Sequence, residues 1–166
     1  MKTDKVYLVG FMGAGKTTVA RGLARRLDWQ AVDIDERIEQ REHETVADLF
    51  AKRGEAYFRA VERAILIELV GTRHLVVATG GGTFVDPQNR SAINHDGLSI
   101  WIDVPLDRLI ARVPADGRRP LAADRVEFER LYTARRPAYA LAHHRIEGGR
   151  GPVGALVEQL VDWLES

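Results

Sequence analysis

The segment GFMGAGKTT at residues 10–18 constrains the fold of this chain more than any other segment. It fits the pattern G-x-x-x-x-G-K-[ST], and it stands between an apolar, β-prone run at residues 6–9 and a run at 17–27 with apolar residues at helical spacing. The segment is therefore expected to join a buried strand to a helix. In that position glycines let backbone N–H groups surround an anion, and the helix N-terminus adds a positive dipole end. A glycine-rich turn that binds nothing is the alternative, which the match of strand, spacing, lysine and threonine disfavours.

This loop predicts a site for a nucleoside triphosphate. Lys16 can reach the β- and γ-phosphates, and the Thr17 hydroxyl can hold Mg²⁺, the expected cofactor. The loop residues that we expect to contact the nucleotide are Gly13, Ala14, Gly15, Lys16, Thr17 and Thr18.

Length and composition limit the remaining possibilities. At 166 residues the chain suits one α/β domain over residues 1–166. It contains no cysteine, which excludes disulfides and a cysteine nucleophile, and its formal net charge of zero argues against a sequence-independent nucleic-acid binder. No apolar run approaches the ~20 residues of a membrane span. We expect a cytoplasmic protein, a monomer, with no nucleic-acid or membrane partner.

Strand and helix signals alternate along the chain. The β-prone runs lie at residues 6–9, 29–32, 75–78, 98–102 and 144–146. Helical patterns cover residues 16–27, 36–41, 46–52, 55–70, 88–94, 106–112, 125–135 and 153–164. This alternation predicts an α/β fold, a five-stranded, mostly parallel sheet with helices on both faces. Ligands of such sheets bind beyond the carboxyl ends of the strands.

Two aspartates follow the second expected strand, in the sequence Asp33-Ile34-Asp35. Side chains two positions apart on an extended segment point the same way, so both carboxylates can face the phosphate loop. A phosphotransferase needs one carboxylate near Mg²⁺ and another to orient or deprotonate the attacking hydroxyl. The third strand ends in Thr79 rather than an aspartate, which makes Asp33 the candidate for the metal. The alternative is that Asp35 merely caps a helix beginning at Glu36, and the neighbouring phosphate loop favours catalysis.

Three glycines, Gly80, Gly81 and Gly82, follow the third strand. From this segment alone, a flexible turn is as good an explanation as a binding loop. At the carboxyl end of a strand, glycines would also let backbone N–H groups approach a substrate closely.

Arg59 lies on an expected helix, one turn from Glu55 and from Glu62. A solvated ion-pair face is the usual role of such residues. The functional alternative is a guanidinium fork that Glu62 holds ready for a carboxylate.

Turn-forming residues and two arginines interrupt the helical patterns at residues 114–121. A surface loop with solvated arginines is one interpretation. The other is a mobile lid that closes over the triphosphate and brings one of the two arginines to the transferring phosphoryl group.

Taken together, these motifs resemble those of the shikimate kinases, small P-loop enzymes of aromatic amino-acid biosynthesis that phosphorylate the 3-hydroxyl of shikimate with ATP. The resemblance runs from about Val6 to Trp163. It rests on the loop at 10–18, D-x-D at 33–35, G-E-x-x-F-R-x-x-E at 54–62, T-G-G-G at 79–82, R-P-L at 119–121 and R-R-P-A-Y at 135–139.

For the acceptor, the resemblance implies that Asp35 contacts the ring hydroxyls and is the base. Arg59 would bind the substrate carboxylate, and Arg135 would be its second ligand. Backbone contacts would come from Gly80, Gly81 and Gly82, and the substrate-binding helices would span about 35–63.

For the nucleotide, the resemblance implies that Asp33 serves magnesium through water and that Arg119 acts from a lid at about 113–123. Arg112, Arg150 and Pro152 would contact adenine, on a looser match of spacing. The expected catalytic residues are thus Lys16, Asp35 and Arg119.

One departure from the family pattern is a shorter segment between Pro120 and Tyr139. It leaves open where the lid hinges, and it makes Arg136 a competitor of Arg135 for the substrate carboxylate.

Two rivals remain. Another small-metabolite kinase of this architecture, such as gluconate kinase, would share the loop and lid but has no need of both arginine motifs. An ATP-binding regulatory module that has lost catalysis would also have no use for the paired arginines.

Overall fold

The structure is a computed structural model that describes residues 1–112 and 125–166. Within them, one sheet has the strand order β2-β3-β1-β4-β5, and all its neighbouring strands run parallel. The strands are β1 (Lys5–Val9), β2 (Gln30–Asp33), β3 (Leu75–Ala78), β4 (Leu98–Asp103) and β5 (His144–Glu147). The helices are α1 (Lys16–Leu27), α2 (Ile34–Glu42), α3 (Val46–Leu69), the 3₁₀ turn η1 (Thr83–Val85), α4 (Pro87–Asp96), α5 (Leu106–Arg112), α6 (Arg125–Tyr139) and α7 (Val153–Glu165).

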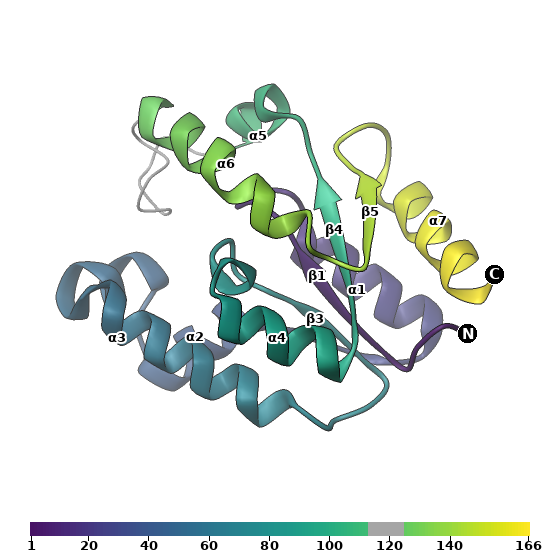
Figure 1. The fold of residues 1–166 in the computed structure, drawn as a ribbon, viewed down its shortest axis with the longest axis horizontal. Helices are drawn as coiled ribbons and strands as arrows, with labels where there is room; N and C mark the ends of the chain where they lie inside the picture. Colours follow the sequence, from purple (N-terminus) through teal and green to yellow (C-terminus); the bar gives the residue numbers. More distant parts are fainter. Residues whose placement is uncertain (113–124) are drawn as a thin grey trace.

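Helices lie on both faces of this parallel sheet, which confirms the expected fold class. Figure 1 shows α4 and α6 on one side of the sheet and α1 and α7 on the other. The helices α1 and α7 pack so closely that a Cβ atom on Gly22 would lie 3.0 Å from Val157 Cγ2. The expected lid at 113–123 lies outside the described residues.

The central strands β1 and β3 are buried along their whole length. Their sequences, KVYLV and LVVA, are nearly continuous apolar runs, as strands covered by helices on both faces must be. None of the helices in the described part of the chain has both the length and the hydropathy that a membrane crossing requires.

Most elements lie within two residues of their sequence-based bounds, and two helices and one turn depart further. The helices expected at 46–52 and 55–70 are joined in α3, across a kink where Gly54 adopts φ 82° and ψ 170°. Such a positive φ favours glycine, so Gly54 accounts for the kink. Helix α6 continues through Pro137 to Tyr139 instead of ending at Arg135. The short turn η1 had no signal of its own.

A cluster of buried charges lies at the amino end of the sheet, opposite the phosphate loop. The Lys5 ammonium is fully buried and contacts both the Asp96 carboxylate and the Leu69 carbonyl. Asp96 also accepts hydrogen bonds from the Tyr7 hydroxyl at 2.6 Å and from the Gly71 N–H at 3.0 Å. Burial alone would raise the pKa of Asp96, but the hydrogen bonds from Lys5, Tyr7 and Gly71 outweigh it and hold this pKa below its usual value.

We expect Asp96→Asn to lower the free energy of unfolding at pH 7 by about 3–5 kcal/mol, because it leaves the buried Lys5 ammonium without its carboxylate. Since the pKa of Asp96 is lowered on folding, its charge stabilises the wild type above about pH 4, and this contribution disappears as the pH falls through the folded pKa. In urea denaturation, the difference in free energy of unfolding between the wild type and Asp96→Asn should therefore be large at pH 7 and smaller at pH 3. Asp4→Asn, at an exposed carboxylate paired with Arg73, is the control and should change little. Equal effects of the two substitutions would contradict this account.

Candidate active site

The phosphate loop leaves β1 at Gly10 and enters α1 at Lys16. Gly10 has φ 148°, and a Cβ atom there would lie 2.8 Å from the Ile102 carbonyl oxygen, so no side chain fits. Gly13 and Gly15 adopt φ 81° and 91°, in the left-handed region that favours glycine. Lys16 is 8% exposed, and its ammonium donates to the loop carbonyls of Gly10 and, at 3.3 Å, Phe11. The loop thus has the strand-to-helix geometry that its sequence predicts.

A cavity of about 290 Å³ lies beside this loop. One wall is the loop and the start of α1, and the other is the glycine-rich segment after β5 together with the start of α7. The expected nucleotide residues that line it are Gly13, Ala14, Gly15, Thr18, Arg112, Arg150 and Pro152. The Arg112 guanidinium also donates to the Gly13 carbonyl at 3.1 Å.

Sequence reasoning did not find the glycines and apolar residues of this second wall. The lining residues that it missed include Gly148, Gly149, Gly151, Leu156 and Gln159. The signal for them was present, because the run EGGRG at residues 147–151 follows the carboxyl end of a strand.

Thr17 and Asp33 meet beside the loop. The Thr17 hydroxyl donates to one oxygen of the Asp33 carboxylate, and the other oxygen accepts from the Glu36 N–H at 3.0 Å. Asp33 is therefore the N-cap of α2, a role that the sequence had offered to Asp35 as the alternative. The argument from an extended segment was wrong, because α2 begins at Ile34 and puts Asp35 in its first turn.

The oxygens of Thr17 and Asp33 suit Mg²⁺, which usually takes one or two protein oxygens together with phosphate and water. No group of three or more His, Cys, Asp or Glu side chains placed to hold a metal occurs in residues 1–112 and 125–166. The described residues therefore contain no site in which protein side chains alone would coordinate a metal. Thr17 and Asp33 suit a metal ion whose other ligands include phosphate oxygens.

The glycine run after β3 lies against three side chains from three other elements. A Cβ atom on Gly80 would lie 2.9 Å from the Asp35 carboxylate, and one on Gly81 would lie 3.1 Å from the Arg135 guanidinium. A Cβ atom on Gly82 would overlap the Arg59 guanidinium. These glycines therefore make room for charged side chains, and a flexible turn does not account for them.

Arg59 is held by a buried carboxylate. Its Nη1 atom lies 2.9 Å and 3.2 Å from the two oxygens of Glu62, which is completely buried, while the exposed Glu55 is 3.6 Å from Nε. An ordinary solvated ion pair would not bury one partner completely. Arg59 is itself only 28% exposed, so its guanidinium is held at the glycine run in a fixed orientation.

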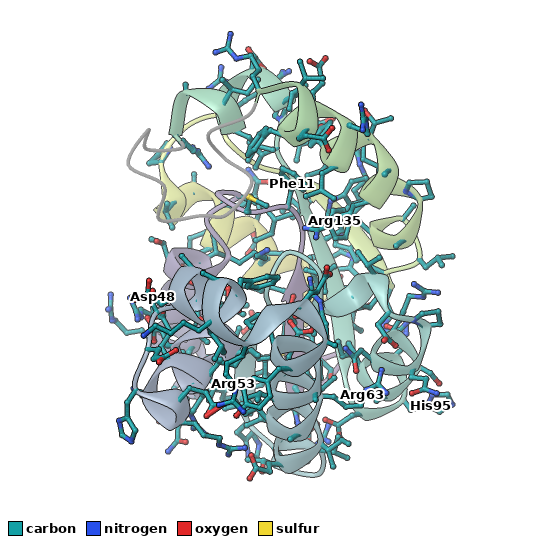
Figure 2. All side chains as sticks on the ribbon, turned by 90° about the vertical axis from the view of Figure 1, so that its left-hand side faces the viewer. Phe11, Asp48, Arg53, Arg63, His95 and Arg135 are labelled. Carbon is teal, nitrogen blue, oxygen red and sulfur yellow. The ribbon has the colours of Figure 1, made fainter. Side chains whose placement is uncertain are left out.

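The two adjacent arginines of α6 point to different places. Arg136 binds the Asp103 carboxylate at 2.8 Å and 3.2 Å. Burial would raise the pKa of Asp103, but hydrogen bonds from Arg136 and Arg145 outweigh it and keep this pKa below its usual value. Arg135 instead lies beside Gly81, with its guanidinium 5.9 Å from the centre of the Phe11 ring. Figure 2 shows the side chains of Phe11 and Arg135 close together.

Tyr139 ties the end of α6 to the glycine run. Its hydroxyl donates to the Gly81 carbonyl at 2.5 Å. Burial raises the pKa of Tyr139 to about 12, while the charges of Arg135 and Arg59 act in the opposite direction. The charges of both arginines therefore act on one buried hydroxyl that binds the glycine run. Arg119, the remaining expected catalytic residue, lies outside the described residues.

Comparison with known proteins supports one family. The family model for shikimate kinase matches residues 12–165. A shikimate kinase of Persephonella marina is 41% identical over 149 residues, which cover 89% of this chain and 91% of that protein. The structure of the Acinetobacter baumannii shikimate kinase in complex with shikimate has a TM-score of 0.92 and 34% identity, over 98% of this chain and 93% of that one. That of Aquifex aeolicus shikimate kinase has a TM-score of 0.87 and 32% identity, covering 97% and 96%. The chain therefore belongs to the shikimate kinase family.

Proposed function

We propose that this chain transfers the γ-phosphoryl group of ATP to the 3-hydroxyl of shikimate, with Lys16, Asp35 and Arg119 as the catalytic residues. Membership of the shikimate kinase family supports the reaction class, which is ATP-dependent phosphorylation of shikimate in aromatic amino-acid biosynthesis. The single observation that supports the assignment of residues is the meeting of Asp35, Arg59 and Arg135 at Gly80–Gly82, beyond the end of β3.

The nucleotide would lie in the cavity beside the phosphate loop. The loop amides and the Lys16 ammonium would neutralise the β- and γ-phosphates, and Arg112, Arg150 and Pro152 would line the base end. In this proposal Arg119 completes the charge neutralisation from a lid at about 113–123.

Magnesium would be held at Thr17 and Asp33, whose oxygens already share a hydrogen bond. A metal held by these oxygens would supply positive charge to offset the negative charge that develops during phosphoryl transfer. Because Asp33 also caps α2, the metal site and the helix that carries Asp35 share one residue.

The acceptor would bind at the glycine run. Arg59 and Arg135 provide two guanidinium groups for one carboxylate, and Arg forms bidentate pairs that fix a planar carboxylate in orientation. Asp35 would then accept the proton of the ring hydroxyl as it attacks, which is general-base catalysis. Since phosphoryl transfer depends mostly on positioning, holding the carboxylate fixes where that hydroxyl lies.

The assignment of the acceptor site is tested with Arg59→Lys and Arg135→Ala. We expect each to raise the KM for shikimate by about 10- to 100-fold, the cost of a lost charge-assisted hydrogen bond, while the KM for ATP changes little. The measurement is a coupled ADP-release assay with each substrate varied in turn.

Arg63→Lys is the matched control for these variants. It lies on the same helix as Arg59 but pairs with Asp86 at 2.6 Å, away from Glu62. If all three variants raise the KM for shikimate equally, or if gluconate is used as well as shikimate by the unmutated chain, the acceptor assignment is wrong.

The remaining expectations are part of the same proposal. Residues 1–166 would act as one domain, with substrate-binding helices at about 35–63. We propose a cytoplasmic monomer whose partners are ATP and shikimate, without nucleic acid or membrane, on the basis of the neutral net charge and the lack of a long apolar run.

A further inference from the structure

Thr83, which belongs to none of the sequence motifs, is buried between two parts of the proposed acceptor site. It is the first residue of η1 and has no solvent exposure. Its hydroxyl oxygen accepts a hydrogen bond from the Gly80 N–H at 2.9 Å and lies 2.7 Å from a carboxylate oxygen of Glu62. Because an ionised carboxylate can only accept, the single hydroxyl proton must be donated to Glu62. The hydroxyl therefore makes two buried bonds, each in a fixed direction.

The first of these bonds acts on Arg59. Thr83 binds Oε2 of Glu62, while Nη1 of Arg59 lies 2.9 Å from Oε1 and 3.2 Å from Oε2. A completely buried carboxylate needs partners for both oxygens. The Thr83 hydroxyl is the second partner of Oε2, and it fixes Glu62 in the orientation in which both oxygens face Arg59, with Oε1 at the shorter distance.

The second bond acts on Gly80, which lies against Asp35. A Cβ atom on Gly80 would lie 3.2 Å from the Thr83 hydroxyl and 2.9 Å from the Asp35 carboxylate. The N–H of Gly80 is used by Thr83, so the hydroxyl fixes the position of the backbone that borders Asp35. One side chain thus joins the residue proposed to bind the carboxylate with the backbone beside the proposed base.

We propose that Thr83 is a positioning residue for shikimate binding, acting through Glu62 on Arg59 and through Gly80 on the pocket beside Asp35. This inference rests on the proposed function of Arg59. Thr83 itself touches neither substrate.

The test compares Thr83→Val, which keeps the shape but removes the hydroxyl, with Thr83→Ser, which restores it. We expect the valine variant to lower kcat/KM for shikimate by about 10- to 100-fold, chiefly through KM, because it leaves a buried N–H and a carboxylate oxygen each short of a partner. The KM for ATP should stay within about twofold, and the serine variant should recover most of the loss. A role limited to stability would not raise one KM and spare the other.

A double-mutant cycle that combines Thr83→Val with Arg59→Lys tests whether Thr83 acts through Arg59. If Thr83 acts through Arg59, the valine substitution costs much less in the lysine background than in the unmutated chain. Ser99→Ala is the control for loss of a buried hydroxyl elsewhere, since Ser99 is completely buried and donates to Asn94 at 2.6 Å. It should leave the KM for shikimate unchanged.

Several outcomes would overturn the inference. These are a valine variant with a KM for shikimate within twofold of normal, a serine variant as impaired as the valine variant, or fully additive effects in the cycle. If the valine variant does not fold by circular dichroism, Thr83→Ala, which cannot overpack the site, replaces it with the same expectations. A folded, unmutated chain that does not phosphorylate shikimate would instead refute the proposed function.

Discussion

Turnover of the Asp35→Asn variant is expected to fall by about 10²- to 10⁴-fold while nucleotide binding is retained. Asparagine keeps the size of the side chain but cannot accept the hydroxyl proton. Asp35 lies in the first turn of α2, beside Gly80, and is not one of the residues that line the nucleotide cavity. The variant should therefore bind ATP with normal affinity in calorimetric titration and release little ADP in a coupled assay with shikimate.

Glu36→Gln is the matched control, because Glu36 is the next residue of α2 and its side chain forms an exposed ion pair with Arg21. It should retain near-normal turnover. Turnover of the Asp35 variant within a few fold of the unmutated chain would rule out Asp35 as the base. Loss of ATP binding in that variant would show that the two sites are not separate.

The second large effect is expected for Lys16→Ala, with turnover reduced by about 10²- to 10³-fold, the scale for loss of one preorganised electrostatic group. The Lys16 ammonium donates to the carbonyls of Gly10 and Phe11 at the N-terminus of α1, where it can neutralise the negative charge that develops on the phosphates. Lys16 belongs to the phosphate loop and the start of α1 and not to the apolar core, so circular dichroism should show a folded protein.

Lys52→Ala provides the comparison, because the Lys52 side chain is exposed and forms a surface ion pair with Glu44 at 3.2 Å. Its turnover should match that of the unmutated chain. Should the Lys16 variant, folded and pure, turn over at a near-normal rate, the phosphate loop would not be the site of transfer.

Much of the site could be predicted because it depends on local sequence and on one rule of topology. The phosphate loop has a fixed spacing, and parallel strands bring their carboxyl ends to one edge of a sheet. Asp35 and Gly80 follow two such strands, so the sequence was enough to place them near each other. The strands were found for a related reason, since β1 and β3 are apolar throughout.

What the sequence could not provide depends on contacts between distant segments. The reason for glycine at 80–82 is the presence of side chains from α2, α3 and α6, which no local pattern reveals. The competition between Arg135 and Arg136 was equally undecidable, because it depends on Asp103, a residue of β4 that holds Arg136. The geometry of Asp33 and Asp35 was misjudged because β2 ends at Asp33, two residues before the end of an extended D-x-D, and α2 begins at Ile34.

The nucleotide cavity also has a consequence for synthesis of the chain on the ribosome. Apart from Arg112, its lining comes from residues within 13–19 and 147–159, so one wall is translated early and the other late. A nascent chain with a finished phosphate loop still lacks the glycine-rich segment after β5 and the helix α7 that packs on α1. ATP in the cell therefore cannot stabilise partly synthesised chains through this cavity, and only molecules that have folded to completion gain stability from binding it.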